Sequence, residues 1–160
     1  MPIAHINIGS NIGNRLALIE RAVSLIEASV GTPVRRASVI ESAPWGYSSP
    51  NPFLNLGIAF EVPPGQELEL FEKLQQIQNS ISVIPHRSAD GSYADRPIDI
   101  DLIAIGSSVV NLPQLVLPHP RMHLRHFVLR PMMQLQPHWV HPLLGMTPEQ
   151  MLHQLQNSCK

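Results

Sequence analysis

The segment 53–62 constrains the fold most strongly, because its side chains alternate between two faces along its whole length. The even-numbered positions are all large and apolar, whereas the odd-numbered ones mix an aromatic residue with small and polar ones. Alternation with a period of two is typical of a strand that buries one face. The segment is therefore predicted to be a half-buried β-strand that needs both a sheet partner and a covering layer. Its apolar face consists of Leu54, Leu56, Ile58, Phe60 and Val62.

The other periodic segments place this strand third among four. Strands are predicted at the segments that are apolar-rich or alternate in polarity, namely 3–8, 34–41, 53–62 and 97–105. Apolar residues at helical spacing predict one helix over 12–30, which Gly31 would end, and a second helix after the turn at 63–65. The order β-α-β-β-α-β predicts an α+β protein with a ferredoxin-like antiparallel sheet and helices on one face.

The rest of the chain completes this expected organisation as a single domain spanning 1–160. A C-terminal extension is expected to contain two further helices, near 123–134 and 147–157. Loops are expected at 42–52 and 83–94, and both are expected to move. In the last of the four strands, one face is expected to consist of Ile98, Ile100, Leu102 and Ala104.

Composition excludes several classes of protein. The net charge is -1 and only 14% of the residues are charged, so no bulk attraction to nucleic acid is expected. No apolar run approaches the roughly 20 residues of a membrane-spanning helix, so no membrane association is expected. The single cysteine, Cys159, allows neither an intrachain disulfide nor a cysteine-based zinc site. The first residues lack the pattern of a signal peptide, and a cytoplasmic protein is expected.

The charges are unevenly distributed along the chain. All four aspartates lie within 90–101, and 102–148 contains no acidic residue. Asp99 and Asp101 are two residues apart in a predicted strand, so their carboxylates should lie on one face, with Cα atoms about 6.6 Å apart. A Mg²⁺ ion shared with substrate phosphates would relieve their repulsion. The alternative is a solvent-facing side of the strand, and Arg96 fits either a nearby phosphate or an ion pair.

The acid-free stretch carries a dense run of basic residues. Arginine offers a planar fork of donors, so the run as a group could clamp phosphates. For each residue alone the alternative is a solvated helix face, and a histidine metal site is not expected. The run consists of His119, Arg121, His123, Arg125, His126 and Arg130.

Asn55 beside Phe53 indicates a site for a flat heterocycle. An amide both donates and accepts hydrogen bonds, which suits a ring edge, and an aromatic side chain can stack on the ring. The alternative is a structural asparagine in the strand. Trp45, Tyr93 and Phe127 are further candidates either for stacking or for ordinary packing. The chain has no GxxxxGK[ST] or GxGxxG loop, so bound phosphates would have to be held by metal and arginine.

Four motifs, taken together, resemble one known family. They occur in the family's order between about residues 3 and 142, and the last two are the most specific. They read Gly9-Ser10-Asn11-Ile12-Gly13, Phe53-Leu54-Asn55, Asp95-Arg96-Pro97-Ile98-Asp99-Ile100-Asp101-Leu102 and Leu117-Pro118-His119-Pro120-Arg121-Met122. On these residues the chain resembles the 6-hydroxymethyl-7,8-dihydropterin pyrophosphokinases of folate biosynthesis.

The resemblance implies that a pyrophosphoryl group moves from ATP to the hydroxymethyl oxygen of the pterin, with release of AMP. It implies two Mg²⁺ ions on Asp99 and Asp101, and catalytic roles for this pair together with Arg96 and Arg87. The implied partners are ATP and the pterin, and a monomer is expected. The implied ATP contacts are Gln75, Arg96, His119 and Arg125. The implied pterin contacts are Ser42, Ala43, Pro44, Trp45, Phe53, Asn55 and Phe127, with Asn55 at the ring edge and Phe53 and Phe127 on its two faces.

The chain departs from the family pattern in two places. After the second helix the family usually has a G-R-x-R stretch with two arginines, but here the segment 82–87 contains a single arginine, Arg87. Near the end of that helix, Gln78 stands where an acidic residue is common. Either Arg87 supplies the phosphate clamp alone or turnover is reduced.

Two other functions compete with this interpretation. A non-catalytic binding module on the same fold could sense a small molecule or bind RNA, and the RNA version predicts exposed aromatics on central strands and a basic surface. A different Mg²⁺-dependent phosphotransferase could use the same aspartate pair. The near-zero net charge argues against RNA, and Asn55 with Phe53 and Phe127 favours a pterin-like ring.

Overall fold

The structure is a computed structural model that describes residues 1–82 and 94–158. Most of the expected loop at 83–94 therefore lies outside the described residues. The strands are β1 (Ile3–Ser10), β2 (Arg35–Arg36), β3 (Ile40–Ser42), β4 (Phe53–Glu61), β5 (Asp99–Ile105), β6 (Val110–Asn111) and β7 (Val116–Leu117). The helices are α1 (Arg15–Val30), α2 (Glu67–Ile81), the 3₁₀ turn η1 (Met122–Leu124), α3 (His126–Leu135) and α4 (Pro148–Ser158).

Both predicted helices of the core are confirmed, with ends set by local chemistry. The side chain of Asn14 accepts a hydrogen bond from the backbone N–H of Ala17 and caps α1 at its start. Gly31 ends α1 in the left-handed conformation, as the sequence predicts. The apolar stripes of both helices pack into one core beneath the sheet, with buried residues Ile19, Val23, Ile26, Leu70 and Leu74.

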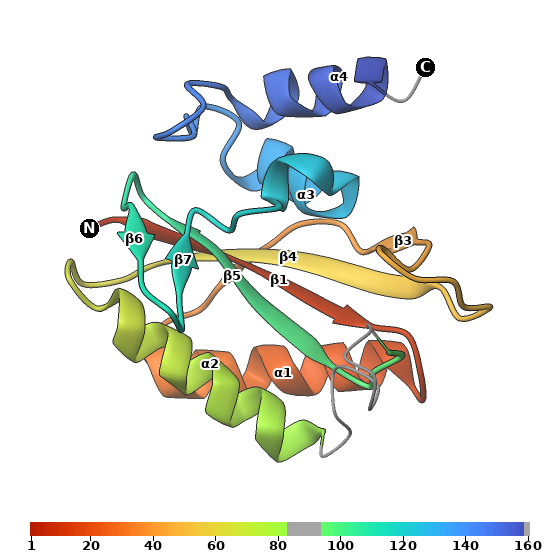
Figure 1. The fold of residues 1–160 in the computed structure, drawn as a ribbon. Helices are drawn as coiled ribbons and strands as arrows, with labels where there is room; N and C mark the ends of the chain where they lie inside the picture. The colour runs from red at the N-terminus through yellow and green to blue at the C-terminus, as the bar shows by residue number, and fades with distance from the viewer. Residues whose placement is uncertain (83–93, 159–160) are drawn as a thin grey trace.

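The main sheet is antiparallel, and β1 lies at its centre between β4 and β5. The strand order is β2-β4-β1-β5, and β3 also pairs with β4. All of the recorded pairings are antiparallel. This places the first and last predicted strands side by side, so residues 90 to 101 positions apart in sequence are neighbours (Figure 1).

The prediction of a single strand at 34–41 is wrong, because two short strands, β2 and β3, form there. Arg36 lies opposite Ile58 and Ile40 opposite Asn55, so the segment carries one residue more than the stretch of β4 that it faces. The ladder therefore breaks between β2 and β3. The backbone N–H of Ser38 instead donates to the Oε1 atom of Gln134 on α3, at 2.8 Å.

Helices cover both faces of the sheet, which corrects the prediction of helices on one face. In Figure 1, α1 and α2 lie on one side of the sheet, and α3 lies on the other with α4 stacked above it. Consequently β4 is buried on both faces and is not the half-buried strand predicted from its alternation. A Cβ atom on Gly57 would lie 2.3 Å from the Cβ atom of Pro131, so only glycine allows α3 to pack this closely.

A bulge in β5 changes the face on which its last residues lie. Ile6 pairs with Leu102 and His5 with Ala104, so Ile103 is an extra residue. Ala104 therefore joins Ile103 in the core beneath α3, whereas the alternation had placed it with Leu102. Ile105 then returns to the core formed with α1 and α2. None of the described helices is both long and apolar enough to span a membrane.

His5 is buried between the sheet and α3, close to Gly57. Neither of its ring nitrogens has a hydrogen-bond partner among the described residues. Burial, with a smaller contribution from the charge of Arg35, lowers the pKa of His5 from 6.5 to about 3. The folded protein therefore keeps this ring neutral at a pH where the unfolded chain protonates it.

This histidine should make the protein sensitive to acid. Between about pH 6.5 and pH 3 the unfolded state binds a proton that the folded state excludes, so the free energy of unfolding should fall by up to about 1.4 kcal/mol for each unit of decreasing pH. In His5→Leu this contribution is absent, and the stability of the variant relative to wild type should rise as the pH falls from 7 to 4. Urea unfolding at several pH values measures it. The exposed His153→Leu is the control, and a constant difference for His5→Leu would contradict the expectation.

Candidate functional site

Three neighbouring strands bring the predicted site residues together on the α3 face of the sheet. Gly9 of β1 lies opposite both Asp99 of β5 and Asn55 of β4. Asn7, two residues earlier on the same face, lies opposite Asp101. A Cβ atom on Gly9 would come within 3.3 Å of the Phe53 ring and 3.5 Å of the Asn55 Oδ1 atom. The glycine thus leaves a hollow between the aspartate pair and Asn55.

This hollow is the first cavity of the site, and most of the predicted pterin contacts line it. Its free volume is about 30 Å³, because side chains of both signs and three aromatic rings fill it. Pro44 is the one predicted pterin contact that is not among the lining residues. The wall towards the loop and β4 consists of Ser42, Ala43, Trp45, Phe53 and Asn55, and the opposite wall consists of Asn7, Gly9, Arg96, Asp99, Asp101, Arg125 and Phe127.

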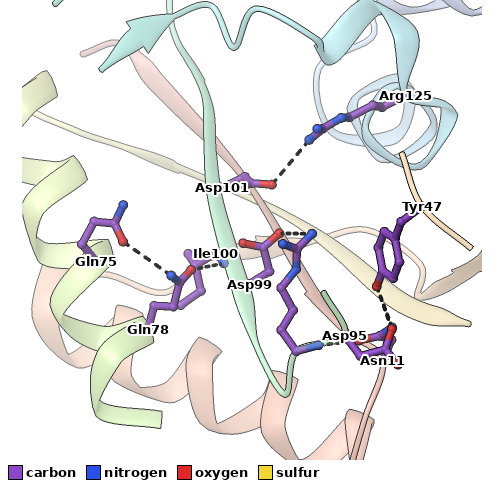
Figure 2. Close-up of polar contacts among 10 residues, drawn as sticks. Asn11, Tyr47, Gln75, Gln78, Asp95, Asp99, Ile100, Asp101 and Arg125 are labelled. Carbon is purple, nitrogen blue, oxygen red and sulfur yellow. Dashed lines mark hydrogen bonds and ion pairs between the residues drawn. The ribbon is translucent and has the colours of Figure 1, made fainter. Parts of the chain in front are cut away.

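Asp99 and Asp101 lie on one face of β5, as their spacing predicts, and each faces an arginine (Figure 2). The Arg96 Nη2 atom is 3.5 Å from the Asp99 Oδ2 atom, and the Arg125 Nη1 atom is 3.8 Å from the Asp101 Oδ2 atom. Burial, followed by the charge of Asp99, raises the pKa of Asp101 to about 7, although both arginines oppose this shift. The two arginines therefore do not fully compensate the paired negative charge.

The donor set of this pair suits a hard divalent cation. Carboxylate oxygens are the ligands that Mg²⁺ prefers, and the ion usually takes one or two of them together with water and phosphate oxygens. Within 1–82 and 94–158, no group of three or more His, Cys, Asp or Glu side chains is arranged to hold a metal ion. Asp99 and Asp101 are the protein ligands that the described structure offers.

The two arginines also pack against the aromatic walls of the first cavity. The guanidinium carbon of Arg125 lies 4.5 Å from the centre of the Trp45 ring and 5.9 Å from that of Phe127. The guanidinium carbon of Arg96 lies 5.5 Å from the centre of the Phe53 ring. These distances are within the range of cation–π contacts. The guanidinium groups thus occupy the space next to the faces where a flat ring would stack.

A second, larger hollow of about 340 Å³ lies on the other side of the aspartate pair. Gln75 of α2 and His119 line it together with Asp99 and Asp101, so the pair is shared by both hollows. Burial, followed by the charge of Arg125, lowers the pKa of His119 to about 4, and the ring is neutral at pH 7. Its Nδ1 atom accepts the backbone N–H of Arg121 at 3.1 Å, which leaves Nε2 to carry the ring proton as a donor.

Several polar residues of this region were not identified from the sequence. Asn7 is 4% exposed, and its Oδ1 atom has no partner among the described residues. Asp95 accepts hydrogen bonds from Asn11 and from three residues of the 42–52 loop. The signals for Asp95 were its place among four clustered aspartates and at the start of the third motif, and neither indicated its hydrogen-bond partners. Arg87 and Tyr93 lie outside the described residues.

Comparison with known proteins decides between the competing interpretations. The sequence profile of 7,8-dihydro-6-hydroxymethylpterin-pyrophosphokinase (HPPK) matches residues 5–137. The chain belongs to the HPPK family. The resemblance seen in the four sequence motifs is therefore confirmed.

Similar HPPK proteins cover most of this chain. It is 36% identical to 2-amino-4-hydroxy-6-hydroxymethyldihydropteridine pyrophosphokinase of Porphyromonas gingivalis over 147 residues, which are 89% of this chain and 95% of that relative. Identity to the Bacillus subtilis protein of the same name is 33% over 134 residues, or 83% of this chain and 77% of that relative.

Solved structures support the HPPK fold. A crystal structure described as HPPK-DHPS in complex with substrates superposes with a TM-score of 0.70 at 11% identity and covers 99% of this chain. Wild-type HPPK-DHPS of Plasmodium falciparum superposes with a TM-score of 0.63 at 12% identity over 96% of this chain. The chain spans 44% of the length of each of these two structures. At this identity the likeness establishes a mixed α/β fold with an antiparallel sheet.

Gln78 connects α2 of this HPPK to the middle of the aspartate pair. Its Oε1 atom accepts the backbone N–H of Ile100, the residue between the two aspartates, at 2.7 Å (Figure 2). Its Nε2 atom lies 3.5 Å from the Oε1 atom of Gln75. Gln78 is buried, and both Gln78 and Ile100 line the second hollow, so only water entering from that hollow could replace the lost acceptor of the Ile100 N–H. The residue that departs from the family pattern thus supports the strand that carries both carboxylates.

Gln78→Ala should therefore destabilise the protein by about 0.5–1.5 kcal/mol, which is the usual net contribution of one hydrogen bond. Gln76→Ala is the matched control, because it makes the same substitution at an exposed position of the same helix. Urea unfolding of the two variants and of wild type measures the effect. Equal midpoints for the two variants would show that the Ile100 bond does not support the strand.

Proposed function

We propose that the protein transfers a pyrophosphoryl group from ATP to 6-hydroxymethyl-7,8-dihydropterin through the site described above. The observation that carries this proposal is one aspartate pair shared by two hollows of different character. One hollow has aromatic walls and a buried amide, which suit a flat heterocycle. The other is larger and more open, and its lining mixes polar and apolar side chains, which suits the base and the phosphates of a nucleotide. The β-phosphorus of ATP, placed beside Asp99 and Asp101, would lie where the nucleotide in one hollow meets the pterin in the other.

The first cavity is the proposed pterin site. The amide nitrogen of Asn55 donates to the Ser42 hydroxyl at 2.9 Å, so its Oδ1 atom is the acceptor left for an N–H of the ring. Phe53 and Phe127 would lie on the two ring faces, with the segment from Ser42 through Ala43 and Pro44 to Trp45 at its edge. A cavity of about 30 Å³ cannot hold a bicyclic ring. Ring binding therefore requires Arg125 or Arg96 to leave the aromatic faces.

The second hollow is the proposed ATP site. Gln75 and the neutral His119, with its Nε2–H donor, would contact the nucleotide, and Arg96 and Arg125 would turn from the rings towards the phosphates. Asp99 and Asp101 would hold two Mg²⁺ ions. Bound there, Mg²⁺ would neutralise the phosphate charge and favour ionisation of the attacking hydroxyl. Arg87 lies outside the described residues, and its role in the clamp stays a prediction.

The chemistry requires positioning and charge compensation more than a protein nucleophile. The hydroxymethyl oxygen of the pterin forms a bond to the β-phosphorus of ATP. The bond from that phosphorus to the oxygen bridging it to the α-phosphorus breaks, and AMP leaves with that oxygen. The hydroxyl proton passes to solvent or to a phosphate oxygen. Arg96 and Arg125 would stabilise the negative charge that moves onto the leaving group.

We further propose that 1–160 acts as one domain with a ferredoxin-like sheet, as a cytoplasmic monomer without nucleic-acid or membrane partners. The strand order β2-β4-β1-β5 supports the ferredoxin-like assignment, because β2 and β3 together occupy the place of one strand at the sheet edge. The two cores pack on opposite faces of that one sheet, which supports a single unit.

The reaction can be tested directly. With ATP, Mg²⁺ and 6-hydroxymethyl-7,8-dihydropterin the protein should release AMP, whereas ADP or inorganic phosphate as the product would refute the proposal. Asp99→Ala and Asp101→Ala should each lower kcat at least about a hundredfold, since metal-assisted stabilisation supplies several kcal/mol. Excess EDTA should have a comparable effect. Glu69→Ala removes an exposed acid of α2 and should leave kcat unchanged.

Asn55→Ala should weaken pterin binding at least about tenfold, because a ring N–H loses its buried acceptor. Its effect on ATP binding should be small. Asn79→Ala is the matched control, since it makes the same substitution at an exposed position of α2 and should leave both affinities unchanged. Fluorescence titration with the pterin and calorimetric titration with ATP separate the two effects. Equal losses for both substrates would indicate a folding defect instead of a ring contact.

A further inference from the structure

Asp95 accepts hydrogen bonds from four side chains. Its Oδ1 atom accepts from the amide of Asn11 at 2.8 Å and from the hydroxyl of Tyr47 at 2.9 Å. Its Oδ2 atom accepts from the hydroxyl of Ser49 at 3.0 Å and from the amide of Asn51 at 2.6 Å. We call Asp95 and these four donors the Asp95 network. Burial alone would raise the pKa of Asp95, but the hydrogen bonds lower it below its ordinary value, in keeping with a carboxylate that accepts from all sides.

The Asp95 network joins three segments that are distant in sequence. Asn11 lies in the turn between β1 and α1, and Tyr47, Ser49 and Asn51 lie in the loop 42–52. Asp95 itself lies in the segment that leads into β5. Figure 2 shows Asp95 between Tyr47 and Asn11, below the aspartate pair. The loop of the proposed pterin site is thus fastened to the chain that enters the metal-binding strand.

Asn11 extends this connection to the backbone of Arg96. Its Oδ1 atom accepts the N–H of Arg96 at 2.8 Å, and its own backbone N–H donates to the carbonyl of Arg96 at 3.2 Å. These two bonds link Asn11 directly to the Arg96 backbone, whereas Asn11 contacts the Asp95 carboxylate through its separate amide nitrogen. The Arg96 side chain in turn faces Asp99 and the Phe53 ring. Loss of the Asp95 carboxylate would therefore free the loop while leaving the Arg96 backbone in place.

The loop 42–52 is attached to the phosphate side of the site at a second point. Trp45 packs against the guanidinium of Arg125, which pairs with Asp101. This contact has to loosen when a ring enters the first cavity, because the free volume there is only about 30 Å³. The bonds to Asp95 lie outside that cavity and can persist while the ring binds. They would then be the attachment that keeps the loop in register with Arg96.

We propose that Asp95 is a positioning residue that sets the pterin-binding loop relative to Arg96, so that the pterin hydroxyl meets the phosphates that Arg96 contacts. The inference rests on the proposed function, because it assigns the loop to the pterin and Arg96 to the nucleotide. It does not make Asp95 a ligand of either substrate. Its carboxylate acts on the loop through Tyr47, Ser49 and Asn51, and its backbone continues directly into Arg96.

Asp95→Asn is the sharpest test, because it keeps the shape and replaces one accepting oxygen with an NH₂ group that faces donors. The KM for the pterin should rise at least about tenfold, which corresponds to the loss of one charge-assisted hydrogen bond. The affinity for ATP without pterin should stay within about twofold, because Asn11 still holds the Arg96 backbone. Glu41→Gln is the matched control, since it makes the same chemical change at an exposed carboxylate that pairs with Arg15 beside the loop.

A rescue variant distinguishes positioning from general destabilisation. In Asp95→Asn/Asn51→Asp the donor and acceptor of the 2.6 Å contact are exchanged, so the loop regains a charge-assisted bond to residue 95. This double variant should recover most of the lost pterin KM. Tyr47→Phe removes only one donor of the network and should also raise the pterin KM, by a smaller factor than Asp95→Asn. If Asp95→Asn does not fold, the pterin KM of Tyr47→Phe is measured in its place.

The outcomes are separable from a failure of the proposed function. If the wild-type protein releases no AMP, the proposed reaction is wrong whatever the variants do. With an active wild type, an unchanged pterin KM in Asp95→Asn, equal losses for pterin and ATP, or no recovery in the double variant would each overturn the positioning role. If Asp95→Asn does not fold, an unchanged pterin KM in Tyr47→Phe would overturn it. A selective rise in pterin KM with recovery supports the role.

Discussion

Mutual repulsion between Asp99 and Asp101 is the constraint on which the arrangement of the site depends. The two carboxylates share one face of β5, and burial together with that repulsion raises the pKa of Asp101 to about 7. Arg96 and Arg125 face the pair from two sides, and Gln78 holds the peptide between the carboxylates from the opposite face of the sheet. Keeping two acids this close costs stability, and such a pair of carboxylates suits a divalent cation.

The elements that cover the α3 face of the sheet enclose the aspartates of β5 in two hollows. β1, β4 and β5 alone would present Asn55 and the aspartates on an open surface. The C-terminal extension covers that surface and supplies Arg125 and Phe127 to one hollow and His119 to the other. The segment that the sequence pattern left outside the β-α-β-β-α-β core therefore builds one wall of the candidate site. Removing it would expose the second core as well as both hollows.

Local sequence patterns predicted what local physics determines. The helix α1 with its glycine stop, the existence of strand β4 and the shared face of Asp99 and Asp101 are confirmed, because each depends only on backbone periodicity. The half-burial expected for β4 is wrong, because it depends on whether a distant helix covers the second face. The break between β2 and β3 depends on a bond from Ser38 to α3, and the bulge at Ile103 depends on pairing with β1. Neither partner is adjacent in sequence. The Asp95 network could not be predicted from the sequence for the same reason, since its donors lie 44 to 84 residues away from Asp95.

The contact between Gly57 and Pro131 limits how the site can adapt to its ligands. Every neighbouring residue on that face of β4, such as Asn55 and Ala59, carries a Cβ atom that Pro131 could not approach as closely. Any slide of α3 along the strand would therefore meet a steric barrier. Arg125, immediately before α3, would therefore make room by rotating its own side-chain torsions, without a shift of the helix. The protein thus combines a helix fixed in the middle of its length by Pro131 with a side chain that can rearrange at its N-terminus.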